Sequence, residues 1–117
     1  FIILKNHNVS PQLLNQAYDI MKKLYALPTD IKKSYIAQGA GFQRGYTPFG
    51  QEHAKDSPVM DLKEFWHVGR ELPEGHDLKK VYPDNVWPDA VPEFKPIFME
   101  IYQSLEKAGE VMLEALT

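Results

Sequence analysis

The chain has 117 residues and a formal net charge of −3, from 13 lysines and arginines against 16 aspartates and glutamates. That balance, with no basic stripe, argues against a nucleic-acid partner. The sequence contains no cysteine, which excludes disulfides, a thiolate nucleophile and a zinc–thiolate site. No apolar run approaches the roughly 20 residues of a membrane span and no secretory signal is visible, so we expect a cytoplasmic protein without a membrane partner.

The first third of the chain predicts a strand and two helices. The apolar run Phe1–Leu4 indicates a short strand buried on both faces. Ser10-Pro11 is a strong helix start, and apolar residues at three- and four-residue spacing then predict an amphipathic helix over about 11–26. A shorter helix is expected over about 30–36, with Lys32-Lys33 on a solvated face.

The middle of the chain predicts two strands, about 42–49 and 60–68, separated by a polar stretch. In the second strand, one face carries large apolar side chains and is interrupted by Glu64, which is unusual. A proline-rich crossing segment over 70–92 and a long helix from about Phe94 complete the chain. Because the chain opens inside a strand and closes in helical stride, we expect it to be part of a longer protein.

Metal and phosphate motifs are weak. None of the four histidines begins a His-x-Asp or His-x-Glu pair, and Glu64-x-x-His67 lies in an expected strand, where positions three apart face opposite sides. The glycines of the sequence GAGFQRG miss the dinucleotide-binding spacing and lead into a strand, whereas a pyrophosphate site needs a helix. We therefore expect no catalytic, cofactor-binding or metal-ligating residue within these 117 positions.

The sequence GFQRGYTPFG places Arg44 among aromatic residues and glycines. One interpretation is a structural ion pair with a nearby carboxylate of Glu52, Asp61 or Glu64. The other is a guanidinium that faces a pocket and binds a carboxylate in two-point fashion, with Tyr46 and Phe49 as walls. Both interpretations predict damage from Arg44→Ala, so stability alone does not separate them.

Four stretches, read in order, resemble the N-terminal region of isopenicillin N synthase-like oxygenases, which are non-haem iron(II) and mostly 2-oxoglutarate-dependent enzymes. They are ILKNHNVS, LYALPTDIKKSY, GFQRGYTPFGQEHAKD and DLKEFWHVG. The match departs at Asn8, where the family has glycine. Each stretch alone is weak evidence, but four in register cover nearly the whole chain.

The resemblance implies an α+β fold: residues 1–117 would form a single mixed α/β N-terminal segment that packs on a double-stranded β-helix, or jelly roll. In this family the iron ligands and the residues that hold 2-oxoglutarate come later, so we expect the catalytic barrel C-terminal to Thr117. Fe(II) and 2-oxoglutarate are expected for the full enzyme, with no ligand to either in this chain.

By the same resemblance, Arg44, Tyr46, Phe49 and Phe65 are expected to contribute to the pocket for a small organic substrate. Two alternatives stay open. In the first, the chain is a stand-alone binding or dimerisation module derived from the family, and it associates through the apolar stripe of its last helix. In the second, the enzyme uses iron without 2-oxoglutarate, and the sequence of this upstream region does not distinguish the two kinds of enzyme.

Overall fold

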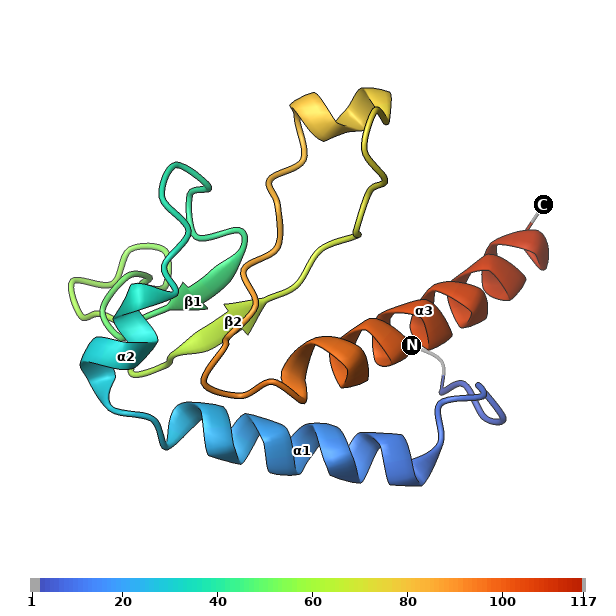
Figure 1. Cartoon of the computed structure of the whole chain (residues 1–117), viewed down its shortest axis with the longest axis horizontal. Coiled ribbons are helices and arrows are strands. Elements are labelled where there is room, and N and C mark those ends of the chain that lie inside the picture. Colours follow the sequence, from blue (N-terminus) through green and yellow to red (C-terminus); the bar gives the residue numbers. More distant parts are fainter. Residues whose placement is uncertain (1–2, 117) are drawn as a thin grey trace. The chain divides into compact units, whose positions relative to one another are not determined.

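The computed structural model describes residues 3–116, and within them the chain is α+β, as expected (Figure 1). It contains three α-helices, a short 3-10 helix and one two-stranded sheet. Two compact units can be distinguished. The helical unit comprises the chain up to Ala26 and from Pro88 onward, and the hairpin unit comprises Leu27–Trp87.

The helical unit is built from α1 (Pro11–Tyr25) and α3 (Phe94–Glu114), which contact each other. The Ser10 side chain accepts a hydrogen bond from the backbone N–H of Leu13 at 3.1 Å, and Pro11 follows at the first helical position. The buried residues of α1 recur at helical spacing: Leu13, Ala17, Ile20 and Leu24. The start and the apolar face of α1 thus follow directly from the sequence pattern.

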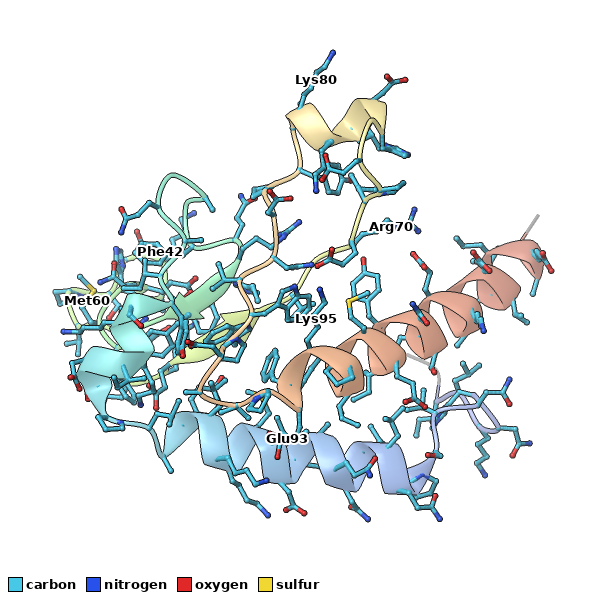
Figure 2. All side chains as sticks on the ribbon, viewed as in Figure 1. Phe42, Met60, Arg70, Lys80, Glu93 and Lys95 are labelled. Carbon is cyan, nitrogen blue, oxygen red and sulfur yellow. The ribbon has the colours of Figure 1, made fainter. Side chains whose placement is uncertain are left out.

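Helix α3 begins at Phe94, which is buried and stacks on Phe98 with 4.2 Å between ring centroids. Pro96 lies in the first turn, where its missing N–H costs no helical hydrogen bond. Further along α3, several members of the apolar face are exposed, including Leu105. Figure 2 shows Glu93 at the start of this helix, where its carboxylate accepts a hydrogen bond from Lys23 at 3.3 Å.

The hairpin unit contains α2 (Thr29–Ser34) and an antiparallel sheet of β1 (Gly45–Thr47) and β2 (Phe65–His67). Tyr46 pairs with Trp66 in this register. Both strands are shorter than the ranges expected from the sequence. Phe42 and Gly45 have φ values of 58° and 69°, outside the β region, so the extended backbone does not run on from residue 42 and β1 is confined to Gly45–Thr47.

The strand expected at Phe1–Leu4 is not seen where the structure describes it. Ile3 and Leu4 are in no strand, and Ile3 is 90% exposed, while residues 1–2 lie outside the described residues. A strand needs a hydrogen-bonded neighbour, and none of the segments from residue 3 to 116 pairs with Ile3 or Leu4. Apolar composition alone therefore mispredicted these two residues.

The proline-rich crossing segment is irregular, as expected, except for η1 (Asp77–Lys80). Its start is capped by the His76 ring, whose Nδ1 accepts a hydrogen bond from the backbone N–H of Leu78 at 3.1 Å. Over residues 3–116, none of the helices combines the length and the apolar character that crossing a bilayer requires.

Candidate functional site

Three elements of the hairpin unit meet at one carboxylate. Lys32 of α2 donates hydrogen bonds to both oxygens of Glu64, at 2.7 and 3.0 Å, and Tyr46 of β1 donates its hydroxyl hydrogen to Oε2. The Lys32 ammonium also lies 5.7 Å from the centre of the Tyr46 ring. We call Lys32, Tyr46 and Glu64 the polar cluster.

The alternation of side chains along the two strands explains how the cluster assembles. Tyr46 and Trp66 are direct partners and share one face of the sheet, and Glu64, two residues before Trp66, is directed to the same face. On that face lies α2, whose neighbour Tyr35 contacts the Trp66 ring at 5.6 Å. A carboxylate is tolerated on this apolar face because Lys32 and Tyr46 both donate hydrogen bonds to it.

Burial makes the polar cluster energetically important. Lys32 is only 6% exposed and Tyr46 1% exposed. The expectation that Lys32-Lys33 form a solvated face was therefore wrong for Lys32 and right for Lys33, which is exposed. Lys32 is buried because a carboxylate is available to it, and removing one partner of such a pair leaves an uncompensated charge, at a cost of roughly 3–5 kcal/mol.

The polar cluster forms one side of a pocket of about 160 Å³. The pocket is lined by Thr29, Lys32, Lys33, Tyr46, Pro48, Phe49 and Glu64. Phe49 is 53% exposed, so its ring is accessible, whereas Tyr46 is almost completely buried. Because Glu64 and Lys32 compensate each other's charge, the exposed Lys33 gives the pocket a net positive character.

Arg44 makes no ion pair with any of the three carboxylates proposed from the sequence. Within residues 3–116, Glu64 binds Lys32, while Glu52 and Asp61 both bind Lys63, at 2.8 and 3.1 Å. The hydrogen bond that Lys63 donates to Glu52, and then the one it donates to Asp61, raise the pKa of Lys63. The ion-pair interpretation of Arg44 was wrong because Lys32 and Lys63 bind these acids instead.

The Arg44 side chain instead lies against the backbone of Gly69, where a Cβ would overlap with the guanidinium. Nη1 donates to the backbone carbonyl of Gln43 at 2.6 Å. Nε is buried and has no hydrogen-bond partner among the described residues. A buried donor without an acceptor is costly, so the unsatisfied Nε of Arg44 calls for an explanation.

Phe65 lies on the face of the sheet opposite Tyr46, since it pairs with Thr47. Its ring contacts the His67 ring edge-on, with 4.8 Å between centroids. The structure thus brings two of the four predicted pocket residues together, Tyr46 and Phe49. Arg44 and Phe65 lie elsewhere in the same unit and do not line this pocket.

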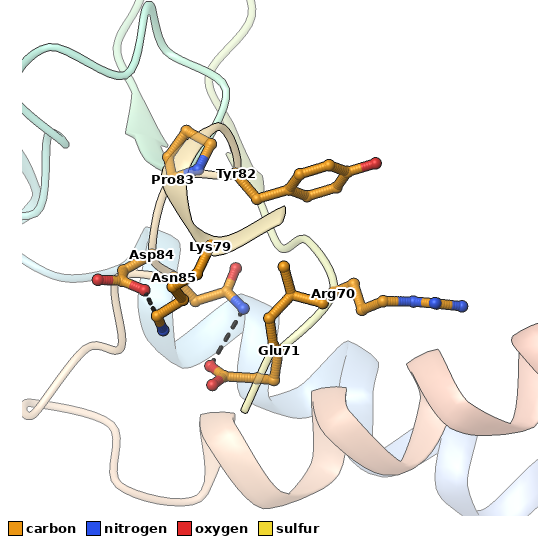
Figure 3. A pocket seen from close by; sticks show the side chains of 8 residues that line it. Arg70, Glu71, Lys79, Tyr82, Pro83, Asp84 and Asn85 are labelled. Atoms are coloured by element: carbon orange, nitrogen blue, oxygen red, sulfur yellow. Dashed lines mark hydrogen bonds and ion pairs between the residues drawn. The ribbon is translucent and has the colours of Figure 1, made fainter. Parts of the chain in front are cut away.

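A second polar arrangement was not predicted from the sequence. The Asn85 side chain donates to the carbonyl of Gly69 and accepts from its N–H, both at 2.8 Å, as a neighbouring strand would. Glu71 accepts from Asn85 at 3.1 Å and from the Trp87 indole at 3.0 Å. Asn85, Glu71 and Lys79 border a cavity of about 10 Å³, room for one water molecule (Figure 3). We therefore assign a structural role to this arrangement.

The described residues do not fit an iron site. No three histidine, aspartate or glutamate side chains between residues 3 and 116 are grouped to hold a metal ion. His67, for example, contacts the carbonyl oxygen of Phe42 through Nδ1 at 2.8 Å.

Comparison with known proteins gives consistent matches. Residues 1–90 match the family described as non-haem dioxygenase in morphine synthesis, N-terminal. The 2-oxoglutarate-dependent dioxygenase caaD of Aspergillus niger is 30% identical over 99% of this chain and 36% of its own length. A 2-oxoglutarate-Fe(II) type oxidoreductase of Aspergillus fumigatus is 33% identical, with the same coverage. The chain thus spans about a third of the length of these curated relatives.

A solved structure is similar as well. The crystal structure of a 2OG-Fe(II) oxygenase family protein from Caulobacter crescentus aligns with 92% of this chain, at 44% identity and a TM-score of 0.82. The aligned region is 35% of that protein.

Proposed function

Because the chain belongs to the family of N-terminal regions of non-haem dioxygenases, we propose that it is the pocket-shaping N-terminal part of an iron(II)/2-oxoglutarate-dependent oxygenase acting on a small organic substrate. The resemblance seen in the sequence is confirmed at the level of the family. The observation that carries the proposal is the likeness, in both sequence and structure, to the Caulobacter oxygenase.

In this proposal residues 1–117 form one segment, and the jelly-roll barrel with the iron and 2-oxoglutarate sites lies C-terminal to it. When bound, iron and 2-oxoglutarate would activate O₂, which is the oxidant for a C–H bond of the substrate. The residues described here would bind and orient the substrate and exclude water. We propose a cytoplasmic location for the enzyme, which cell fractionation would test.

We assign the four predicted pocket residues to two parts of the hairpin unit. Phe49, exposed beside Tyr46, would contact an apolar part of the substrate in the pocket of about 160 Å³. Arg44 and Phe65 would contact substrate outside that pocket. For Arg44 the support is chemical: Glu52, Asp61 and Glu64 are bound by lysines, and a guanidinium binds carboxylates with two parallel hydrogen bonds.

The test uses the full-length protein with Fe(II), ascorbate and 2-oxoglutarate, and follows succinate formation with a panel of small carboxylic acids and aromatic compounds. We expect succinate formation that a substrate stimulates. Arg44→Lys should raise the apparent KM for that substrate and leave the iron content unchanged, while Arg70→Lys serves as the matched control. An unchanged KM for Arg44→Lys would contradict the substrate role of Arg44. Oxidation of the substrate without formation of succinate would show that the enzyme does not use 2-oxoglutarate.

A second candidate function is a binding or dimerisation module without catalysis. The observation in its favour is the set of exposed apolar residues along α3, which include Leu105, Val111 and Leu113. Light scattering of the purified protein distinguishes the two functions. A dimer that Leu105→Glu dissociates, together with absent succinate formation, would favour the module.

A further inference from the structure

We propose that Glu64 is a positioning residue for Tyr46, and through it for the side of the pocket that Tyr46 and Phe49 form. This inference rests on the proposed function in one respect, the contribution of Tyr46 to the substrate pocket. Glu64 would not contact the substrate. It would fix the direction of the Tyr46 ring by accepting its hydroxyl hydrogen.

Backbone pairing holds the main chain at Tyr46, through β2 on one side and a bridge between Ile36 and Gly45 on the other, but it does not by itself set the direction of the ring. Strand β1 has three residues, and the pairing with β2 extends over the same short length. Gly45, immediately before Tyr46, has a φ of 69°, so the regular alternation of side chains does not extend back to Arg44. One further backbone hydrogen bond, from the Tyr46 N–H to the carbonyl of Tyr35 at 3.1 Å, holds the main chain.

The Tyr46 side chain is held in addition at its far end, where the hydroxyl donates to Glu64. A buried hydroxyl without a partner costs on the order of 1–3 kcal/mol, which favours the ring orientation that reaches Glu64. Pro48 and Phe49 follow Tyr46 closely in the chain and line the same pocket as Glu64. A different ring direction would change the space that these residues enclose.

Lys32 has a separate role in the polar cluster. Its ammonium group compensates the charge of Glu64, which allows a carboxylate to lie in a largely buried position. Lys32 donates to both Glu64 oxygens, whereas the Tyr46 hydroxyl donates to Oε2 alone. Charge compensation and positioning can thus be separated by substitution.

The experiment compares two double variants of the full-length protein. Both carry Lys32→Met, which removes the buried cation. Glu64→Gln then keeps an oxygen acceptor for Tyr46, whereas Glu64→Met has a similar length and offers none. Protein with ring-labelled tyrosine and phenylalanine is studied by NMR, with Tyr46→Phe to assign the Tyr46 signals.

In the wild type and in the Gln variant, we expect an NMR signal for the Tyr46 hydroxyl proton and nuclear Overhauser contacts between the Tyr46 ring and Pro48. Both should be lost in the Met variant, although the two variants should unfold at a similar temperature. Ring shifts and contacts that are the same in both variants would overturn the proposal and leave Glu64 a purely stabilising role.

If the Met variant does not fold, Tyr46→Phe alone decides, because it removes only the hydroxyl group. The proposal predicts loss of the ring contacts to Pro48 in that variant, and wild-type contacts would contradict it. None of these measurements needs turnover, so a failed succinate assay would contradict the proposed function without touching the role of Glu64.

Discussion

The two units of the chain are stabilised in different ways. The helical unit buries apolar side chains along two long helices, and all but one of the buried hydrophobic residues of the described chain belong to it. The exception is Tyr46 of the hairpin unit, whose neighbours in the interior include Lys32 and Thr47. The helical unit thus depends on the hydrophobic effect, and the hairpin unit on a few specific polar contacts.

The largest effect is expected at the polar cluster. Lys32→Met leaves the Glu64 carboxylate buried without its cation and should lower the free energy of unfolding by about 3–5 kcal/mol. Denaturant unfolding measures it. Lys33→Met is the matched control on the same helix, exposed and expected to change stability by less than about 0.5 kcal/mol. Equal effects of the two substitutions would contradict the account of the hairpin unit.

In the helical unit, Leu24→Ala should cost about 2–5 kcal/mol, since Leu24 is completely buried and its removal leaves a cavity. The control is Leu113→Ala on α3, where the side chain is exposed. Thermal and denaturant unfolding of both variants provide the measurement. Similar losses for the two leucines would show that the interior of this unit is assigned incorrectly.

Gly45→Ala tests the backbone of the hairpin unit. A Cβ at Gly45 would overlap with the carbonyl oxygen of Tyr35, and φ is positive, so we expect a loss of about 2–4 kcal/mol. Gly39 has a similar φ of 75° with open space around it, so Gly39→Ala should cost only about 1–2 kcal/mol. The difference between the two losses in unfolding free energy measures the cost of the overlap between a Cβ at residue 45 and the Tyr35 carbonyl oxygen. Equal losses would show that this overlap has no cost.

A smaller effect is expected at the start of α1. Ser10→Ala removes the acceptor for the Leu13 N–H and should cost about 1 kcal/mol. Ser104→Ala, inside α3, should be neutral or slightly stabilising because alanine is the better helix former. Calorimetry of the two variants checks the prediction, which is contradicted if Ser104→Ala is the more damaging.

The smallest effects concern exposed charges and have opposite pH dependence in the two units. In the helical unit, a backbone hydrogen bond at Glu93, and then Lys23, lower the pKa of Glu93 below its ordinary 4.5, so this stabilisation is lost as the pH falls below that value. In the hairpin unit, Glu52 and then Asp61 raise the pKa of Lys63 above 10.5, so stabilisation is lost as the pH rises beyond it.

Unfolding midpoints at pH 3.5–6 and at pH 9–11.5 should therefore respond to different substitutions. Glu93→Gln should flatten only the acidic range and Lys63→Met only the alkaline range. Both changes should be small because the side chains are exposed and water screens them. A response of either variant in the wrong range would contradict the assignment.

The same contrast explains what the sequence predicted. Helices α1 and α3 follow from apolar spacing, because periodicity reports which face is buried. The sequence revealed the unusual position of Glu64 in an apolar face, but it did not reveal that Lys32 is the partner of Glu64. Several bases compete for each acid, and spacing in sequence does not rank them, so Arg44 was paired with acids that lysines bind. The contact of Arg44 with the backbone of Gly69 joins residues 25 positions apart, which no local pattern predicts.

The pocket residues were predicted from the resemblance as one group, yet Tyr46 and Phe65 lie on opposite faces of a sheet. The register of β1 and β2 decides this, and a shift by one residue would reverse it. With polar loops on both sides of such short strands, the sequence carries little information on register.

The central claim, that this region shapes the pocket of a larger iron-dependent oxygenase, is tested most directly by the intact mass and iron content of the native protein purified without oxygen. The account predicts a mass well above 13.5 kDa with bound iron. A native protein of 13.5 kDa without iron would contradict it.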